Sequence, residues 1–297
     1  MLPGVELITI SGENVDEVCK LKAKPEQNCN ELDVMKCLAW THHSMFWLRA
    51  IKSGDLIVGM LGVSLDPQDD RSPLLSILLI DGTYQCKGFG KAVMNGLLAE
   101  FSKLYRFLTV KIPAGVEGFF ERFGFHGLSE CEGSIRMIKT FSDTPALRRV
   151  CPQRAVLFKP IDALNFKQVL EIELPHDSII TPIRVARQFF AGGYFFHWER
   201  AIYCDETLVG YVVLNLEPQD GDTPFLNHIV IDKKYQTQGI GSAVIVELFN
   251  LLSRFCKRLT VSTSASLGAV GFYDKLGFKH IGTRPNGGLL LVKEFEP

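Results

Sequence analysis

Short apolar runs bounded by polar turn residues predict strands in the second half of the chain. They cover residues 156–158, 201–204, 208–214 and 225–232. The polar pair at 205–206 separates the two middle runs and is typical of a tight turn. These two runs are therefore expected to form a β-hairpin.

Helical spacing follows directly after the last of these strands. Apolar residues recur three and four positions apart over residues 244–255, and the same spacing occurs over residues 93–104 in the first half. A strand at 259–261, a short helix ending at Gly277 and a strand pair through 289–292 complete the pattern. The pattern predicts a mixed α/β fold.

The second half of the chain repeats the first. Trp47 returns as Trp198 after 151 positions, and the offset becomes 153 where Gly124 returns as Gly277. A constant offset through strands, loops and a helix indicates duplication of a whole domain, with one two-residue insertion. The 151-residue offset also relates Val58-Gly59 to Val209-Gly210, Pro67-Gln68-Asp69 to Pro218-Gln219-Asp220, Tyr84-Gln85 to Tyr235-Gln236, and Leu108-Thr109-Val110 to Leu259-Thr260-Val261.

The two copies are expected at residues 1–145 and 150–297. The stretch 142–154 between them is polar, contains Pro145 and Pro152, and separates two strand-like runs. A length of 297 residues suits two domains of about 150 residues each.

Composition and charge narrow the classes of function. The chain is 46% hydrophobic and 22% charged, and its formal net charge of −1 argues against a nucleic-acid partner. Its eight cysteines are scattered, so neither a zinc site nor a disulfide framework is indicated. The amino terminus lacks the organisation of a secretory signal and no apolar run reaches 18 residues. We expect a cytoplasmic protein with no metal and no membrane contact.

The junction between the strand at 225–232 and the helix after it has a glycine-rich sequence. Gln236 is followed by Gly239 and Gly241, which let backbone N–H groups approach a ligand, and the helix N-terminus adds free donors. Such an arrangement suits a pyrophosphate. There is no third glycine for a dinucleotide fingerprint, and the first copy, although it has Gly90-Lys91, lacks the earlier glycine of a P-loop.

A second motif follows the next strand: Ser266-x-x-Ala269-x-x-Phe272-Tyr273-x-Lys275-x-Gly277-Phe278. With the glycine motif and the order of elements, the sequence resembles the GNAT superfamily of acyl-CoA acyltransferases over both halves. The resemblance implies a mixed sheet splayed between its fourth and fifth strands, with acetyl-CoA in the gap. It assigns the cofactor to Ile229, Val230, Ile231, Gln236, Thr237, Gln238, Gly239, Ile240, Gly241, Ser242, Ser266 and Phe272.

Tyr273 matches the tyrosine that protonates the departing thiolate in many members of that superfamily. An ordinary tyrosine pKa of about 10 lies within two units of a thiol pKa of about 8.5, so this proton transfer is not steeply uphill. The alternative is that Tyr273 is only a core aromatic residue beside Phe272. The sequence departs from the family pattern at Ser266, where asparagine is usual, and at Lys233, where proline is frequent.

The first copy lacks the polar side chains of the second. Phe120 stands for Tyr273, Leu48 for Glu199 and Ile77 for His228, although the first copy keeps its own glycine motif at Gln85, Gly88 and Gly90. We therefore expect a degenerate first domain that binds CoA or acts as a scaffold, and a second domain that catalyses.

Glu199 and His228 are the candidate general bases, and Asn227 is a candidate for orienting a water molecule. Strand alternation puts Asn227 and His228 on opposite faces of the sheet, unless the strand bulges. A lone strand histidine is also frequently a satisfied structural residue.

The predicted activity is transfer of an acetyl group from acetyl-CoA to a small-molecule amine or a protein amino group. One alternative is a non-catalytic CoA-binding or scaffold protein with two degenerate domains, and a weaker one is O-acyl transfer. The sequence does not identify the acceptor, because acceptor specificity lies in variable loops.

Overall fold

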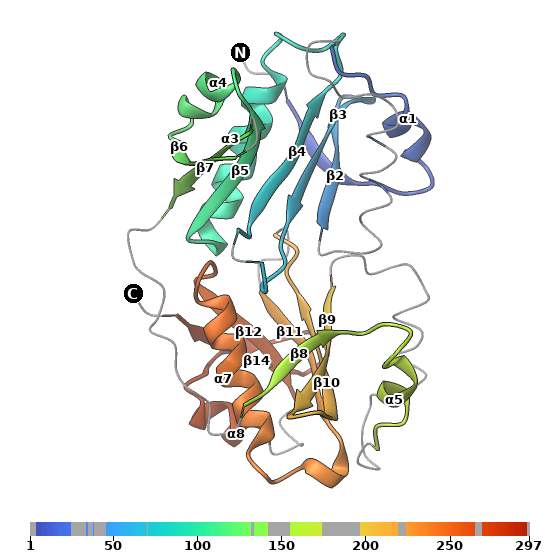
Figure 1. The fold of residues 1–297 in the computed structure, drawn as a ribbon, viewed down its shortest axis with the longest axis vertical. Helices are drawn as coiled ribbons and strands as arrows, with labels where there is room; N and C mark the ends of the chain where they lie inside the picture. The colour runs from blue at the N-terminus through green and yellow to red at the C-terminus, as the bar shows by residue number, and fades with distance from the viewer. Residues whose placement is uncertain are drawn as a thin grey trace. The chain divides into compact units, whose positions relative to one another are not determined.

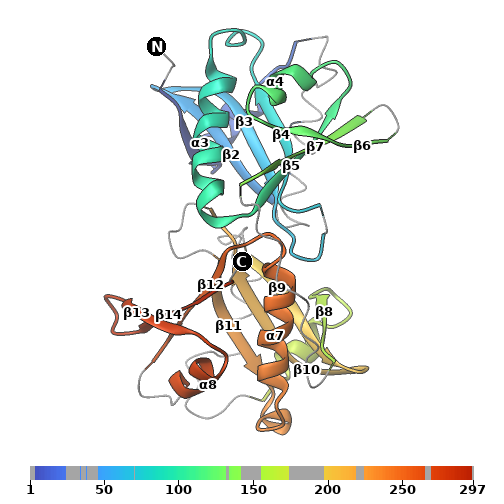
Figure 2. The ribbon, with the colours of Figure 1, turned by 90° about the vertical axis from the view of Figure 1, so that its left-hand side faces the viewer.

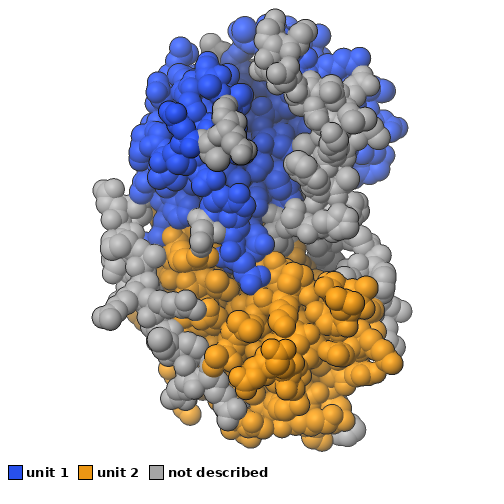
Figure 3. All heavy atoms as spheres, in the orientation of Figure 1, with its two compact units in different colours: residues 1–143 blue, residues 144–297 orange. Residues whose placement is uncertain are grey.

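In the computed structural model the chain divides into two compact units, Met1–Asp143 and Thr144–Pro297, which are coloured separately in Figure 3. Each unit is described by itself. The structure describes residues 4–24, 34, 38, 46–69, 71–131, 134–141, 155–173, 197–218, 224–264 and 269–295.

The first unit contains a seven-stranded mixed sheet in the order β1-β2-β3-β4-β5-β7-β6 (Figure 1). Among the described strands of this unit, only β4 and β5 pair in parallel. Its elements are β1 (Glu6–Thr9), α1 (Val15–Cys19), β2 (Phe46–Ser53), β3 (Leu56–Ser64), β4 (Leu74–Ile80), α3 (Phe89–Leu104), β5 (Phe107–Pro113), α4 (Glu117–Glu121), β6 (His126–Cys131) and β7 (Ser134–Thr140).

The second unit repeats this arrangement in a seven-stranded sheet of order β8-β9-β10-β11-β12-β14-β13. In the described part of this unit, only β11 and β12 pair in parallel. Its elements are β8 (Leu157–Pro160), α5 (Phe166–Leu170), β9 (His197–Cys204), β10 (Thr207–Asn215), β11 (Phe225–Ile231), the 3-10 helix η2 (Lys233–Tyr235), α7 (Ile240–Leu252), β12 (Arg258–Thr263), α8 (Val270–Lys275), β13 (Lys279–Thr283) and β14 (Leu289–Glu294). The predicted mixed α/β fold in tandem is confirmed.

Each sheet has a long helix on one face and a short helix on the other. The long helix α3 crosses the first sheet and α7 crosses the second (Figure 2). Trp47 in β2 packs against Phe101 in α3 with ring centroids 5.9 Å apart. On the opposite face, Val18 of α1 joins a core cluster with Ala50 and Met60. The helices thus cover both apolar faces of the sheet in a three-layer arrangement.

The same two faces recur in the second unit. Helix α7 buries Val244 and Leu248 completely, as its helical spacing predicts. On the other face, Val169 of α5 packs in a cluster that includes Ala201 and Val213. We call this side of the second sheet the α5 face.

The parallel strand pair in each unit is held together at one end only. In the second unit, β11 pairs with β12 at Phe225 and Leu226 alone, and the residues after Leu226 have no partner on β12. The first unit shows the same limit, with Leu74 and Leu75 as the only residues of β4 that pair with β5. Both sheets are therefore splayed between their fourth and fifth strands, as the sequence resemblance implies.

Both fourth strands also contain a β-bulge at the same aligned place. In β11 the register shifts so that Val213 pairs with His228 while Leu214 pairs with Leu226, which leaves Asn227 as the extra residue. In β4 the same shift leaves Ser76 as the extra residue. A bulge bends the strand and re-aims the side chains on either side of it.

Candidate functional site

The glycine motif of the second unit forms a tight turn between β11 and α7. Thr237 and Gly239 both have left-handed backbone conformations, with φ of 60° and 79°. The Gln236 side chain donates its Nε2 hydrogen bond to the Ile231 carbonyl oxygen at 2.9 Å, which ties the turn to the end of the strand. Successive turn residues with alternating hand make a concave group of backbone N–H donors that suits an anion.

Asp232 fixes the start of this turn. Its carboxylate accepts hydrogen bonds from the backbone N–H of Lys234 at 2.9 Å and of Glu173 at 3.2 Å, and the residue is 7% exposed. A short acidic side chain at such a position satisfies backbone donors that have no helical partner. The turn is thus built before any ligand is present.

The side chains of the turn serve its structure more than its ligand. Thr237 Oγ1 donates to the Gln236 carbonyl oxygen at 2.6 Å, Gln238 Nε2 donates to the Lys234 carbonyl oxygen at 3.0 Å, and the Ile240 side chain is buried. What these residues can offer a phosphate is therefore mainly their backbone N–H groups. Ser242 lies in the first turn of α7 and is partly buried.

Gly241 brings α8 beside the turn. A Cβ atom at Gly241 would lie 3.6 Å from the Phe272 ring, so this ring packs directly against the helix backbone. Phe272 adjoins Tyr273 in α8, with ring centroids 5.1 Å apart. The contact places the second motif of the sequence next to the first.

The strand segment expected to hold the thioester lies at the splay. Ile229, Val230 and Ile231 follow the last β11 residue that pairs with β12, so their backbone groups on that side have no partner on β12. The Val230 side chain is buried, and its neighbours are partly buried. Ser266, the remaining predicted cofactor residue, lies outside the described residues.

Tyr273 is enclosed by aromatic rings. The residue is 6% exposed, and the Phe278 ring packs edge-on against it at 5.2 Å. This burial raises the pKa of Tyr273 to about 12. The gap to a thiol pKa of about 8.5 is then roughly 3.5 units, or about 5 kcal/mol, instead of the two units expected from the sequence. The difference arises because an unperturbed pKa does not include burial.

Glu199 and His228 lie on one face of the sheet, on either side of Val213. Val213 pairs with Glu199 on β9 and with His228 on β11, and directly paired residues project from the same face. Glu199 alternates with Ala201, which places it on the α5 face. Burial raises the pKa of Glu199 to about 7, and the charge of Arg200 offsets this only in part. The two candidate bases thus project from the same face of the sheet, with β10 between them.

His197 lies at the start of β9, near Glu199 and Asn227. We call Glu199, His228, His197, Asn227 and Tyr211 the polar group of the α5 face. The His197 Nε2 atom lies 3.1 Å from the Asn227 Nδ2 atom, so the neutral ring accepts a hydrogen bond from the amide. Burial lowers the pKa of His197 to about 4, and the charge of His228 contributes to that fall. At neutral pH the ring is therefore uncharged.

The bulge settles the orientation of Asn227 and His228. The sequence predicted opposite faces unless the strand bulges, and the bulge is present at Asn227. Asn227 contacts His197, while His228 acts electrostatically on the same ring. Both side chains thus interact with His197 on the α5 face.

Two residues of this polar group were not predicted from the sequence, His197 and Tyr211. Tyr211 lies on β10, two residues before Val213, in the core cluster of the α5 face, and is 1% exposed. The internal repeat carried the signal, because His197 aligns with Phe46 and Tyr211 with Met60.

The first unit has the same turn but a different sheet face. Gln85 Nε2 donates to the Ile80 carbonyl oxygen at 2.8 Å, and Cys86 and Gly88 have φ of 62° and 90°. A Cβ atom at Gly90 would lie 3.4 Å from the Phe119 ring, as Gly241 approaches Phe272. The backbone of the turn is therefore duplicated in full.

Where the second unit has its polar group, the first unit has an apolar core. Phe46, Leu48 and Met60 are all buried in the cluster under α1, and Ile77 packs against it. Phe120, which aligns with Tyr273, is 6% exposed and packs edge-on against Phe125 at 5.7 Å. The two units thus share a backbone and differ in the chemistry of one face.

A family model described as Acetyltransferase (GNAT) family matches residues 15–125 and 166–278, one match in each unit. The chain belongs to this family. Membership implies acetyl-CoA as the acetyl donor.

Among relatives in this GNAT family, the chain is 31% identical over 102 residues to a probable spermine N(1)-acetyltransferase of Bacillus subtilis subsp. natto, covering 31% of the chain and 67% of that protein. A spermine/spermidine N(1)-acetyltransferase of Bacillus subtilis is 30% identical with the same coverage. Among solved structures, a PaiA N-acetyltransferase from Thermoplasma acidophilum in complex with coenzyme A matches 48% of this chain and 99% of its own, with 12% identity and a TM-score of 0.37.

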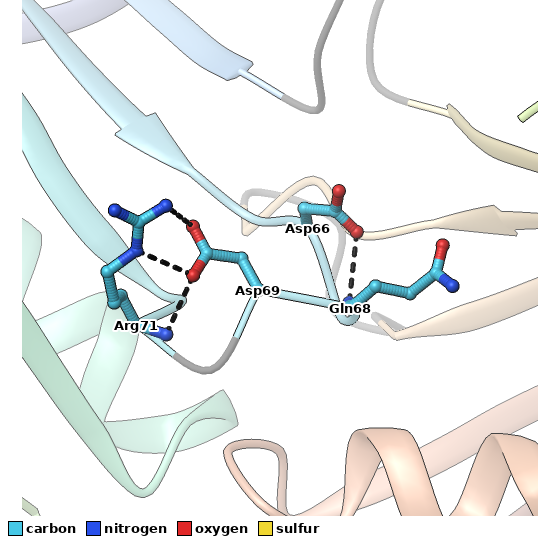
Figure 4. Close-up of a pocket in the computed structure, with 4 residues that line it drawn as sticks. All are labelled: Asp66, Gln68, Asp69 and Arg71. Carbon is cyan, nitrogen blue, oxygen red and sulfur yellow. Dashed lines mark hydrogen bonds and ion pairs between the residues drawn. The ribbon is translucent and has the colours of Figure 1, made fainter.

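One surface hollow of about 570 Å³ lies outside the site of either GNAT unit, in the loop between β3 and β4 (Figure 4). Arg71 turns its guanidinium onto the Asp69 carboxylate, with Nε at 2.8 Å from Oδ1 and Nη2 at 2.8 Å from Oδ2. Asp66 accepts the Gln68 backbone N–H at 3.0 Å. These contacts join residues of the same loop to each other, and we assign no function to the hollow.

Neither metal ligands nor a membrane span stand out in the part of this GNAT chain that the structure describes. No group of three or more His, Cys, Asp or Glu residues there is placed to hold a metal ion. No helix within the same described ranges is long and apolar enough to cross a membrane.

Proposed function

We propose that the second unit transfers the acetyl group of acetyl-CoA to a primary amine, and that the first unit does not catalyse. The observation that carries this proposal is the contrast between the corresponding sheet faces of two units that have the same backbone fold. Glu199, Tyr211 and His228 stand where the first unit has Leu48, Met60 and Ile77. A buried polar group costs stability unless it is satisfied, so its presence on a face that also exists in an apolar form favours a functional role.

The proposed cofactor site is the turn between β11 and α7. Backbone N–H groups of residues 237–242 would receive the pyrophosphate, supported by the N-terminus of the α7 helix. The unpaired side of β11 after Leu226 would receive the pantetheine and thioester. In this proposal the acetyl group would lie beside the polar group of the α5 face.

The proposed transfer is a nucleophilic substitution at the thioester carbonyl. The neutral amine nitrogen attacks, a C–N bond forms, and the C–S bond breaks. The proton lost by the nitrogen passes to Glu199, with His228 as the second candidate base, and the departing sulfur receives the Tyr273 proton. With a pKa of about 12, Tyr273 remains a proton donor throughout the physiological range.

The acceptor we would test first is a polyamine. Two relatives in the family are named as spermine or spermine/spermidine N(1)-acetyltransferases. We infer the amine class from the polar group of the second unit and the particular amine from these names.

The first unit is proposed to bind CoA or to act as a scaffold. Its turn at Gln85, Gly88 and Gly90 keeps the geometry of the second unit. Titration of acetyl-CoA into the intact protein, with and without Gly88→Ala, would separate the two roles. A change in the number of bound cofactors would support CoA binding.

The deciding experiment measures free-thiol release from acetyl-CoA against an amine panel of polyamines, amino acids, aminosugars and peptides. We expect turnover with at least one amine and its loss in Tyr273→Phe, with CoA affinity unchanged. If CoA binds but the wild-type protein acetylates no amine, the alternative of a non-catalytic CoA-binding protein is correct.

A further inference from the structure

Tyr211 is a fully buried tyrosine whose hydroxyl has no hydrogen-bond partner among the described residues. The residue is 1% exposed, and its OH is among the few buried polar side-chain atoms left unsatisfied there. Buried tyrosine hydroxyls ordinarily find a partner, because an unsatisfied one loses its hydration without compensation. An orphaned hydroxyl on the α5 face therefore calls for an explanation.

Glu199 is the charged group that Tyr211 faces. Val213, two residues along β10 from Tyr211, pairs with Glu199, so the two polar side chains are diagonal neighbours on one face of the sheet. Burial raises the pKa of Tyr211 well above its usual range, and the Glu199 charge adds to that rise. The carboxylate is thus close enough to act on the hydroxyl.

No ion pair among the described residues joins the Glu199 carboxylate to a cation, although His228 and Lys159 project from the same face. Arg200 follows Glu199 in β9, and strand alternation directs the two side chains to opposite faces. The Arg200 guanidinium lies over the Trp198 ring, 4.8 Å from its centroid, and its Nη1 donates to the Glu199 backbone carbonyl oxygen at 2.9 Å. On its own face the Glu199 carboxylate has Tyr211, Ala201 and Val213 as neighbours, and His228 lies across β10 from it.

The first unit shows that the sheet does not need these polar groups. Met60 and Leu48 occupy the equivalent positions and are 1% and 3% exposed in a continuous apolar cluster. Apolar side chains at these two places are therefore compatible with the fold. The polar pair of the second unit is best explained by something that it binds.

A carboxylate beside a hydroxyl, lined by aliphatic side chains, matches an alkylammonium group. The ammonium can donate hydrogen bonds to a carboxylate oxygen and to the hydroxyl oxygen, and its positive charge balances the negative charge of Glu199. An acceptor with a carboxylate close to its nitrogen would meet repulsion from Glu199. We propose that Glu199 and Tyr211 form the subsite that binds a second, cationic nitrogen of the acceptor, which leaves His228 to accept the proton of the attacking nitrogen, and that the acceptor is an aliphatic amine without a carboxylate.

This inference rests on the proposed function, since it names the class of acceptor. Its test is a binding measurement that needs no turnover. Calorimetry on the full-length protein with CoA present compares 1,4-diaminobutane with 4-aminobutanoate, which replaces one amine by a carboxylate. We expect the diamine to bind about tenfold more tightly than the amino acid.

Two variants remove the subsite in steps. Tyr211→Phe should weaken diamine binding about threefold to tenfold, as the loss of one hydrogen bond to a charged group predicts. Glu199→Leu with Tyr211→Met copies the first unit and should abolish the preference for the diamine. This double variant should not lower the melting temperature, because the same side chains pack in the first unit.

Matched controls separate the subsite from general effects. Tyr203→Phe removes another hydroxyl from the same core cluster, and Glu206→Gln removes an exposed carboxylate in the adjacent turn. Neither should change diamine affinity. In turnover, Tyr211→Phe should raise the amine KM and leave the acetyl-CoA KM unchanged, as expected for a residue that positions the acceptor.

The outcomes distinguish this inference from the proposed function. Unchanged diamine affinity in Tyr211→Phe and in the double variant would overturn the subsite, even if the wild-type protein acetylates amines. Diamine binding that depends on Tyr211 and Glu199 in a protein that acetylates nothing would support the subsite and overturn the proposed activity. Equal binding of diamine and amino acid by the wild-type protein would also overturn the acceptor class.

Discussion

Leu48 and Glu199 occupy the same position in two sheets of the same topology, and the surroundings of each fit its chemistry. Around Leu48 the face is closed by apolar packing under α1, whereas around Glu199 it carries Tyr211, His228 and His197. The splay, the bulge and the glycine turn are nevertheless common to both units. The comparison separates what builds the fold from what equips a site.

The largest expected effect is a loss of turnover on substitution of Tyr273 in α8, which aligns with Phe120 in α4. Tyr273→Phe, which copies Phe120, should lower kcat by about a hundredfold to a thousandfold because it removes the proposed proton donor for the thiolate. The thiol-release assay measures this, with CoA affinity by calorimetry as the control. Phe120→Tyr in the first unit should leave turnover as it is, and a gain there would break the proposed division of roles.

A smaller effect is expected from moving the carboxylate into the first unit. Leu48→Glu places an unpaired acid in an apolar cluster where Leu48 is 3% exposed, so the free energy of unfolding of that unit should fall by roughly 3 kcal/mol. Urea unfolding measures the loss. Leu56→Glu, at a position that is 55% exposed in the same unit, is the matched control and should cost little. Similar losses in both would mean that the face is less closed than described.

The glycines at the two helix starts allow a matched pair of smaller changes. Gly239→Ala and Gly88→Ala each force a Cβ into a left-handed conformation, and each should cost about 1 kcal/mol of stability. Only Gly239→Ala should raise the acetyl-CoA KM for turnover, by about fivefold to tenfold. The backbone N–H groups of the turn that contains Gly239 would hold the cofactor that reacts. Steady-state kinetics checks this. A rise in KM with Gly88→Ala would instead assign a reacting cofactor to the first unit.

A further expected effect appears only when the pH is varied, and it is on the pH dependence of stability. The folded-state pKa of Glu199, about 7, is raised above its ordinary value of 4.5, so the native state binds this proton more tightly than the unfolded chain. The resulting stabilisation is present below pH 4.5 and is lost as the pH rises through 7. The difference in melting temperature between Glu199→Gln and the wild-type protein should therefore shift in favour of the variant as the pH rises from 5 to 8. Glu206→Gln, in the exposed turn, is the control, and a parallel course for Glu199→Gln would contradict the assignment.

The sequence predicted the tandem fold well because its signals are local. Gly239 and Gly241 mark a turn that needs glycine at the helix start and a close helix approach, and the fixed offset carries that assignment to Gly88 and Gly90. The strands and the long helix α7 of the second half follow from apolar spacing, whereas the short helix α5 was not predicted. Glu199 and His228 were found because their counterparts in the first copy are apolar.

Other parts of the site depend on three-dimensional packing. Tyr211 lies in a strand whose residues from Val209 to Leu214 are all buried, so alternation gives no face and a tyrosine counts as one more core residue. The acidity of Tyr273 changes because Phe272 and Phe278 enclose it. Apolar spacing could not locate the bulge at Asn227, because one extra strand residue leaves no compositional mark.

The bulge also makes the site sensitive to chain length. Because Asn227 is the unpaired residue of β11, deleting it would restore an even ladder and shift one part of the strand against the other by one position. The end of β11 that leads into the glycine turn would then present its opposite edge. One extra residue in β11 thus sets the register between the proposed acceptor side and the proposed cofactor side of the unit. The same extra residue is present as Ser76 in the unit whose sheet face is apolar.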